Sequence, residues 1–143
     1  PVIYWGADER VSDVISDVAE KMQAKTVKVL ADNYKIIKKT NKSVDFSIVS
    51  EYYLNDIFSV PFISEYQVQN AAVAIKTIEC MPEIRNMKDL VKSGIANVHW
   101  EGRMEMIMPG IILDGAHNGP GIDEFIKTFN EYECTGDKNI LFQ

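Results

Sequence analysis

The chain has 143 residues, of which 46% are hydrophobic and 25% charged, and its formal net charge is −6 at pH 7. This size and composition suit one ordinary globular domain or a piece of a larger protein, and they exclude disorder as a description of the whole chain. The negative charge argues against broad binding to nucleic acid or anionic membranes, and no apolar run approaches the ~20 residues of a membrane span.

The N-terminal stretch predicts a βαβ unit. Residues 2–5 are apolar and end at Gly6, Asp8 is placed to cap a helix, and residues 26–30 alternate like a second strand. The helix carries one apolar stripe on a 3.6-residue period, formed by Val11, Val14, Ile15, Val18 and Met22. This succession predicts parallel strands with a right-handed crossover.

A lysine cluster around Thr40 and Asn41 predicts a hairpin. It comprises Lys35, Lys38, Lys39 and Lys42. Because acidic residues follow closely, we interpret the cluster as the exposed face of a hairpin, with a nucleic-acid patch as the less favoured alternative. Val44, Phe46 and Ile48 then alternate with less apolar neighbours, which predicts a half-buried strand, and residues 57–62 predict a further strand.

Two helices should follow these strands. Ser64 is placed to cap the first, whose core face is formed by Val68, Ala71, Ala72, Ile75 and Ile78. Asn70 lies among these small residues, where an amide side chain usually bonds nearby backbone or points to solvent. A shorter helix should begin at Asn86 and stop at Gly94.

The last forty residues predict a turn and then a second unit. Trp100-Glu-Gly-Arg103 reads as a turn between units, so we place the boundary between residues 1–102 and 103–143. A turn at Pro109-Gly110 should precede a strand at residues 111–113, and a helix with Ile122, Phe125, Ile126 and Phe129 on its apolar face should follow a break at residues 119–121. A strand should begin at Asn139. Since the chain opens and closes on strand-like runs, we expect a piece of a longer protein.

Candidate chemistry gathers after the strand at residues 111–113. Asp114, His117 and Asn118 follow it directly, and ligands of open α/β sheets bind beyond the carboxyl ends of strands. A metal site would need a third ligand, and a Ser-His-Asp hydrolase would need a GxSxG elbow that is missing. A structural role also stays open, with Asp114 capping the next turn and His117 bonded to backbone.

Arg103 admits two interpretations as well. An arginine at a turn between units is commonly just solvated. Its guanidinium is also a planar fork of donors that suits phosphate oxygens, and the neighbouring Gly102 would let backbone approach a ligand closely.

Three motifs occur in order along the chain: Gln67-Val-Gln-Asn-Ala-Ala72, Trp100-Glu-Gly-Arg-Met-Glu105 and Leu113-Asp-Gly-Ala-His-Asn118. In this order and spacing they resemble the signature of the folylpolyglutamate synthase / dihydrofolate synthase family of the Mur ligase superfamily. The resemblance covers essentially the whole chain. DGAHN after a GRxE turn is its specific part, whereas the Gln-Asn-Ala-Ala helix alone would be weak.

The resemblance implies a fold and a reaction. The fold is α/β, with the C-terminal part of an ATP-binding central domain (a mixed sheet with helices) in residues 1–102. The first βαβ part of a Rossmann-like, glutamate-ligase domain would occupy residues 103–143. The reaction joins L-glutamate to a folate or dihydropteroate carboxylate, with ATP driving it through an acyl phosphate. Triphosphate and carboxylate repel each other, so Mg²⁺ and fixed donors must relieve the repulsion.

Four site residues are implied by the same resemblance. Asn70 would lie near the adenine side of ATP, and Arg103 would reach from the interdomain linker toward the phosphates. Asp114 and His117 would lie at the hinge side of the ATP site. Arg103, Asp114 and His117 are the expected catalytic residues, and all four residues are expected to bind ATP. Domain closure would assemble such a site.

The chain also departs from the family. Glu101 and Gly119 stand where proline is common, and Tyr66 stands where histidine is frequent. No Gly-rich phosphate loop ending in Lys-Ser or Lys-Thr occurs in the sequence. The resemblance places that loop and the Mg²⁺ ligands outside this chain, so we expect no metal ligands here and no ligase activity from the chain alone.

The remaining expectations concern the parent protein. We expect small-molecule partners (folate or dihydropteroate, L-glutamate and ATP), no nucleic-acid or membrane partner, and a monomer. The cysteines, Cys80 and Cys134, have no metal-binding spacing and suggest reduced thiols in the cytoplasm. Two alternatives stay open: another amino-acid ligase of the Mur superfamily, and a non-catalytic α/β binding domain.

Overall fold

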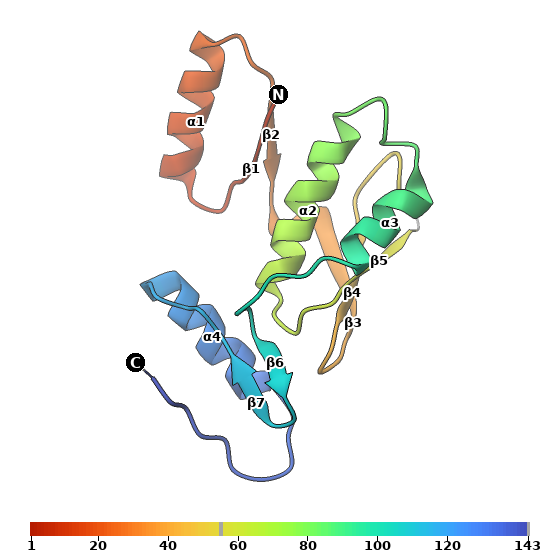
Figure 1. Ribbon diagram of the computed structural model, residues 1–143. Helices are drawn as coiled ribbons and strands as arrows, with labels where there is room; N and C mark the ends of the chain where they lie inside the picture. Colours follow the sequence, from red (N-terminus) through yellow and green to blue (C-terminus); the bar gives the residue numbers. More distant parts are fainter. Residues whose placement is uncertain (55, 143) are drawn as a thin grey trace.

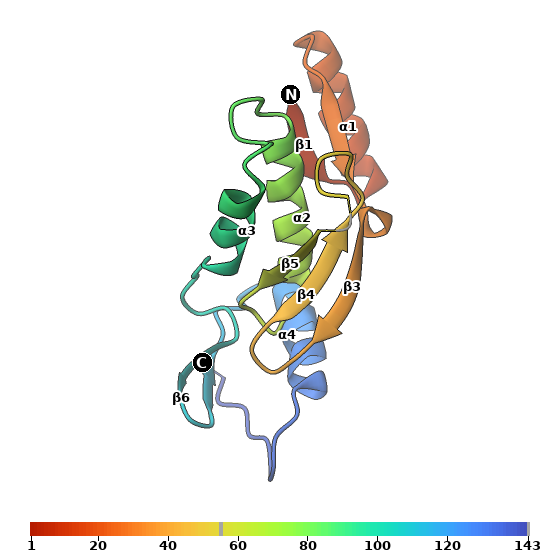
Figure 2. The ribbon, with the colours of Figure 1, turned by 90° about the vertical axis from the view of Figure 1, so that its right-hand side faces the viewer.

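The computed structural model describes residues 1–54 and 56–142. Its elements form an elongated arrangement, with α1 at one end, α2 in the middle, and α4 with β6 and β7 at the other end (Figures 1 and 2). The strands form a parallel pair, a three-stranded antiparallel sheet and a two-stranded antiparallel sheet. The predicted α/β class is confirmed, with parallel and antiparallel strands in separate sheets.

The N-terminal βαβ prediction is confirmed in its elements. Strands β1 (Val2–Trp5) and β2 (Thr26–Val29) pair in parallel, and helix α1 (Glu9–Lys21) connects them. The Asp8 carboxylate caps α1 by accepting hydrogen bonds from the backbone N–H groups of Arg10 at 2.9 Å and Val11 at 3.4 Å.

The apolar stripe of α1, however, is not buried. The buried positions of the helix are Ser12 and Ala19, whereas Val14 is 63% exposed and Met22 is 73% exposed. The helix contacts β2, and Val11, Val14, Val18 and Met22 of the predicted stripe remain exposed to solvent. The period correctly indicated a helix, but the buried face is shifted from the predicted stripe and shares only the half-buried Ile15 with it.

The predicted hairpin is formed by β3 (Tyr34–Lys39) and β4 (Val44–Ile48), and β5 (Ile57–Val60) pairs with β4 on its other side. A 3₁₀ helix (Ala31–Asn33) leads into β3. Along β4, Val44, Phe46 and Ile48 are buried and the residues between them are half-buried, as the alternation predicted.

Helix α2 (Tyr66–Glu79) organises the core. It contacts β1, β2, β4 and β5, and α3 (Lys88–Ala96) packs on β5. The predicted core face of α2 is confirmed, because Val68, Ala72 and Ile75 are fully buried. Opposite them, Phe58 stacks on Phe46 at 5.8 Å between ring centroids and meets Tyr53 edge-on at 5.5 Å.

Two predicted helix boundaries are wrong. Glu65, not Ser64, precedes α2, and no side chain caps that helix; Ser64 is fully buried, and its backbone carbonyl accepts from the Gln67 N–H at 3.2 Å. Helix α3 does not stop at Gly94 but continues to Ala96, with Asn97 as its C-cap. Ile95 packs against the core, which keeps the chain helical beyond the glycine.

After the turn at residues 100–105, where the boundary between two units is predicted, the chain forms a hairpin followed by a helix. Strands β6 (Glu105–Met108) and β7 (Ile111–Leu113) pair in antiparallel register across a turn in which Gly110 has a φ of +81°. Helix α4 (Gly119–Glu131) is capped by Asn118, whose Oδ1 accepts from the Gly121 N–H at 2.9 Å.

Three expectations for this unit need correction. Strand β6 was not foreseen, and residues 139–142 contain no strand, so the described residues show no βαβ unit here. Residues 119–121 begin the helix instead of breaking the chain, because proline in a first helical turn needs no N–H partner.

In residues 1–54 and 56–142, no helix combines the length and hydropathy that a membrane crossing requires.

Candidate functional site

The linker turn at residues 100–105 presents Arg103. Gly102 has a φ of +66° and Met104 a φ of +49°, so two left-handed residues flank the arginine and reverse the chain on either side of it. The Gly102 N–H donates to Oε2 of Glu105 at 2.8 Å. The half-buried Arg103 lies over the Trp100 ring, with its Cζ 5.6 Å from the ring centroid. The turn therefore holds a cation in a defined place.

Loop 114–118 is bonded to this turn through Asp114. One carboxylate oxygen accepts from the Met104 N–H at 2.9 Å, and the other accepts from the Ala116 N–H at 2.8 Å. The Gly115 N–H also donates to the Gly102 carbonyl at 2.8 Å. Asp114 thus joins the linker to the loop and satisfies backbone donors in both.

His117 is exposed at the end of the same loop. Its Nδ1 lies 2.9 Å from the Gly115 carbonyl oxygen. A carbonyl can only accept, so this contact requires the proton on Nδ1. In this tautomer Nε2 carries no proton and can accept a hydrogen bond from a polar group.

The N-terminus of α2 supplies the third part of the site. Tyr66 is half-buried, and its pKa is raised, first by burial and then by the negative charge of Asp114. The positive charge of Arg103 acts on Tyr66 in the opposite direction, so the Tyr66 phenol lies within the field of both residues. One turn further along, the Asn70 amide donates to Oε1 of Gln67 at 2.9 Å, and Asn70 itself is exposed.

The structure therefore brings Arg103, Asp114 and His117 together on the joined turn and loop. It sets Asn70 on the adjacent end of α2, one turn beyond Tyr66. Tyr66 was noted in the sequence only as a departure from the family. Its proximity to Asp114 arises from tertiary contacts, so periodicity and spacing contained no signal for it.

A groove of about 590 Å³ adjoins the loop. Its lining includes Met104, Asp114 and Ala116, apolar side chains of α4, and residues of the segment that follows α4. The His, Cys, Asp and Glu side chains of the described residues form no group of three that could hold a metal ion.

Known proteins share sequence similarity with this chain. No protein-family model matches the chain. The dihydrofolate synthase/folylpolyglutamate synthase of Bacillus subtilis (strain 168) is 28% identical over 102 residues, covering 68% of this chain and 24% of that protein. The folylpolyglutamate synthase of Lacticaseibacillus casei is 35% identical over 77 residues, covering 50% of this chain and 18% of that protein.

The structural comparison agrees with the sequence comparison. A solved mutant of L. casei FPGS superposes with a TM-score of 0.66 at 21% identity, covering 86% of this chain and 32% of that one. The chain therefore shares the α/β fold of that protein over most of its length. Its sequence is similar to those of folylpolyglutamate and dihydrofolate synthases, the family that the three motifs resemble. It spans about a quarter of the length of the B. subtilis relative.

Proposed function

We propose that the protein containing this chain is an ATP-dependent ligase that adds L-glutamate to folate or dihydropteroate. The observation that carries the proposal is the joined turn and loop, which sets Arg103, Asp114 and His117 together in a chain related to folylpolyglutamate and dihydrofolate synthases. In the first step a carboxylate oxygen of the pterin substrate attacks the γ-phosphorus of ATP, forming an acyl phosphate and ADP. The glutamate amine then attacks the acyl carbon, inorganic phosphate leaves, and the amine loses a proton.

Arg103 has the chemistry that the first step needs. Each reacting group is anionic, and a fixed guanidinium stabilises the charge on a transferring phosphoryl group without reorganising at the moment of reaction. The left-handed residues beside Arg103 and its packing over Trp100 support this role, because they limit where the cation can lie. Mg²⁺ would share this task, with ligands outside this chain.

The proposed roles of the other residues follow from their positions. Asp114 would maintain the joint between units 1–102 and 103–143 at the hinge side of the ATP site. The free Nε2 of His117 would face the nucleotide or the incoming amine. Asn70, with an exposed amide on the adjacent end of α2, would contact the adenine side. We further propose a monomeric, cytoplasmic protein with these small molecules as its partners.

One observation favours a different role. Asp114, His117 and Asn70 each make a hydrogen bond within their own segment. In a non-catalytic α/β binding domain these side chains would only need to make such local hydrogen bonds. In a ligase, at least Arg103 and His117 must contact a ligand.

Phosphate release from the full-length protein separates these alternatives. The assay contains ATP, Mg²⁺, L-glutamate and either dihydropteroate or tetrahydrofolate, with glutamate omitted as the control. We expect glutamate-dependent phosphate release with at least one pterin and none from the 143-residue chain alone. No release with either pterin would contradict the proposal, and release with a different acceptor would indicate another branch of the superfamily.

A further inference from the structure

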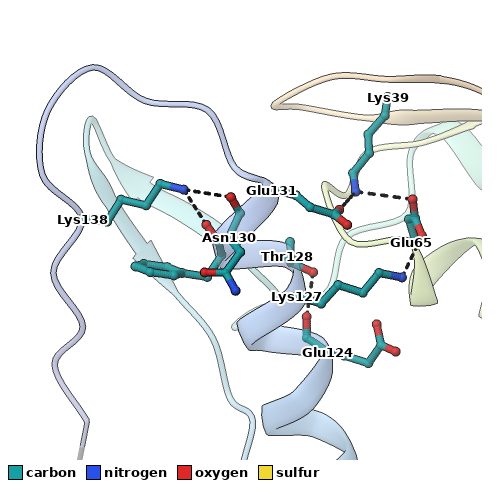
Figure 3. A network of polar contacts seen from close by, with 9 residues as sticks. Lys39, Glu65, Glu124, Lys127, Thr128, Asn130, Glu131 and Lys138 are labelled. Atoms are coloured by element: carbon teal, nitrogen blue, oxygen red, sulfur yellow. Dashed lines mark hydrogen bonds and ion pairs between the residues drawn. The ribbon is translucent and has the colours of Figure 1, made fainter.

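Four alternating charges connect α4 to the first unit (Figure 3). Lys39, the last residue of β3, pairs with Glu131 and lies 3.5 Å from Oε1 of Glu65. Lys127, one turn before Glu131 on α4, donates to Oε2 of Glu65 at 2.9 Å. Each lysine therefore faces a glutamate of the other unit, and we call this set of four residues the charge quartet.

The two quartet residues of the first unit, Lys39 and Glu65, lie next to a hydrogen-bonded turn and to helix α2. Lys39 leads into a tight turn in which Oγ1 of Thr40 accepts from the backbone N–H groups of Lys42 at 3.1 Å and Ser43 at 3.0 Å. From the same turn, the Asn41 amide donates to the Glu133 carbonyl at 2.7 Å. Glu65 immediately precedes α2, the helix at the centre of the core.

Helix α4 divides its contacts between the two units. Ile122, Phe125, Ile126 and Phe129 line the groove shared with β7 and residues 132–142, which belong to the second unit. The bonds described above attach it to the first unit by charged and polar groups. The Asn118 cap thus ties the start of α4 to loop 114–118, while charged and polar groups hold the rest of the helix against the first unit.

Helix α4 and Glu65 connect the quartet to the candidate site. Helix α4 begins directly after loop 114–118, with Asn118 as its cap, and Glu65 is the residue before Tyr66. Fixing Glu65 against Lys127 therefore fixes the loop against the N-terminal end of α2. The pKa of Glu65 is lowered, first by its hydrogen bond from Lys127, and the pKa of Lys127 is raised, first by the same bond, so both members favour the charged pair.

We propose that the charge quartet is a reversible latch that positions loop 114–118 against the N-terminus of α2, with Glu65 as its central positioning residue. The side chains are 28% to 47% exposed, so solvent and salt reach all four of them. An apolar interface would hold the units permanently, whereas exposed charges can separate and reform. The link of the latch to catalysis rests on the proposed function. The positioning of loop 114–118 by the latch does not depend on it.

The two cysteines allow a direct test of the geometry. Cys80 ends α2 in the first unit, Cys134 follows α4 in the second, and both are free and exposed. Nitroxide labels on these two residues report the distance between the units by double electron–electron resonance. We expect a single narrow distribution for the unsubstituted chain, and a broader one shifted to longer distances at 1 M NaCl, where the Debye length is about 3 Å.

Charge substitutions then identify the quartet as the cause. E65K should broaden the distribution at low salt, because it leaves Glu131 as the one anion among three cations. Exchanging Glu65 and Lys127 alone would set like charges beside Lys39 and Glu131, so the rescue inverts all four charges (K39E/E65K/K127E/E131K) and should restore the narrow distribution. K28E is the matched control, because it breaks the exposed Lys28–Glu9 pair of 2.9 Å within the first unit.

The outcomes decide the proposal. A narrow distribution that persists in E65K and at 1 M NaCl overturns the latch, as does a quadruple variant that keeps a native circular dichroism spectrum but stays broad. In the full-length protein, E65K should lower ATP-dependent turnover and the quadruple variant should recover it. Unchanged turnover alongside an altered distance overturns the link to catalysis. No turnover in the unsubstituted protein counts against the proposed function, and the distances still judge the latch.

Discussion

The carboxylate of Asp114 accepts a hydrogen bond from the backbone N–H of Met104 at 2.9 Å, ten residues earlier in the chain. Met104 has a φ of +49°, an uncommon value for a residue with a side chain, and its side chain is buried. The loop after β7 thus stabilises the conformation of the linker that carries Arg103. Asp114 acts on Arg103 through the backbone between them.

We predict that D114A destabilises the chain. It leaves the N–H groups of Met104 and Ala116 without their acceptor, and a polar group left unpaired in a partly buried place costs about 1–3 kcal/mol. D114N retains one oxygen and should lose less. Urea unfolding measures both, with E101A as a control at an exposed position of the same turn. A D114A midpoint equal to that of the unsubstituted chain would contradict the role of Asp114 as a joint.

Arg103 should matter for turnover and little for folding. In the full-length protein, R103A should lower glutamate-dependent phosphate release by at least about tenfold, because a fixed donor at a developing phosphoryl charge is removed. R103K should lower it less, since the charge remains and the planar fork is lost. The melting temperature of each variant serves as the control for folding. An unchanged rate in R103A would refute a phosphate role.

Acid should weaken the attachment of α3 through Asp56. The pKa of Asp56 is lowered, first by its hydrogen bond from Lys92 on α3, with Lys88 contributing. A lowered acid pKa stabilises the fold above the pKa of the unfolded chain, and this stabilisation is lost as pH falls through the folded value. Urea unfolding between pH 7 and pH 3 should therefore show a steeper loss for the unsubstituted chain than for D56N. Parallel profiles would argue against the Asp56 contribution.

The two apolar helix faces should respond differently to truncation. Ile75 on α2 is fully buried, so I75A should cost about 2–5 kcal/mol of unfolding free energy. Val14 on α1 is 63% exposed, so V14A should change stability by less than about 0.5 kcal/mol. Chemical denaturation of both variants compares them directly. A large loss in V14A would mean that the α1 stripe is buried in solution.

Much of this protein could be predicted from its local sequence. The Asp8 cap, the alternation along β4 and the buried face of α2 each depend on residues close together in the chain, where backbone geometry dictates which side chains share a face. The three motifs likewise indicated the family, since their order and spacing belong to the chain itself. The roles of Asn70, Arg103, Asp114 and His117, and the boundary after Gly102, remain predictions.

Tertiary structure alone decided the rest. Periodicity identified α1 as a helix, but packing on β2 buried Ser12 and Ala19 and left most of the apolar stripe exposed. Burial removed Ser64 from its expected capping role, and packing of Ile95 carried α3 past Gly94. The joint from Asp114 to Met104, the approach of Tyr66, and the pairing of Lys39 with Glu131 each join residues that local rules cannot relate. Capping and periodicity act over a few residues, whereas burial and charge pairing depend on where distant segments meet.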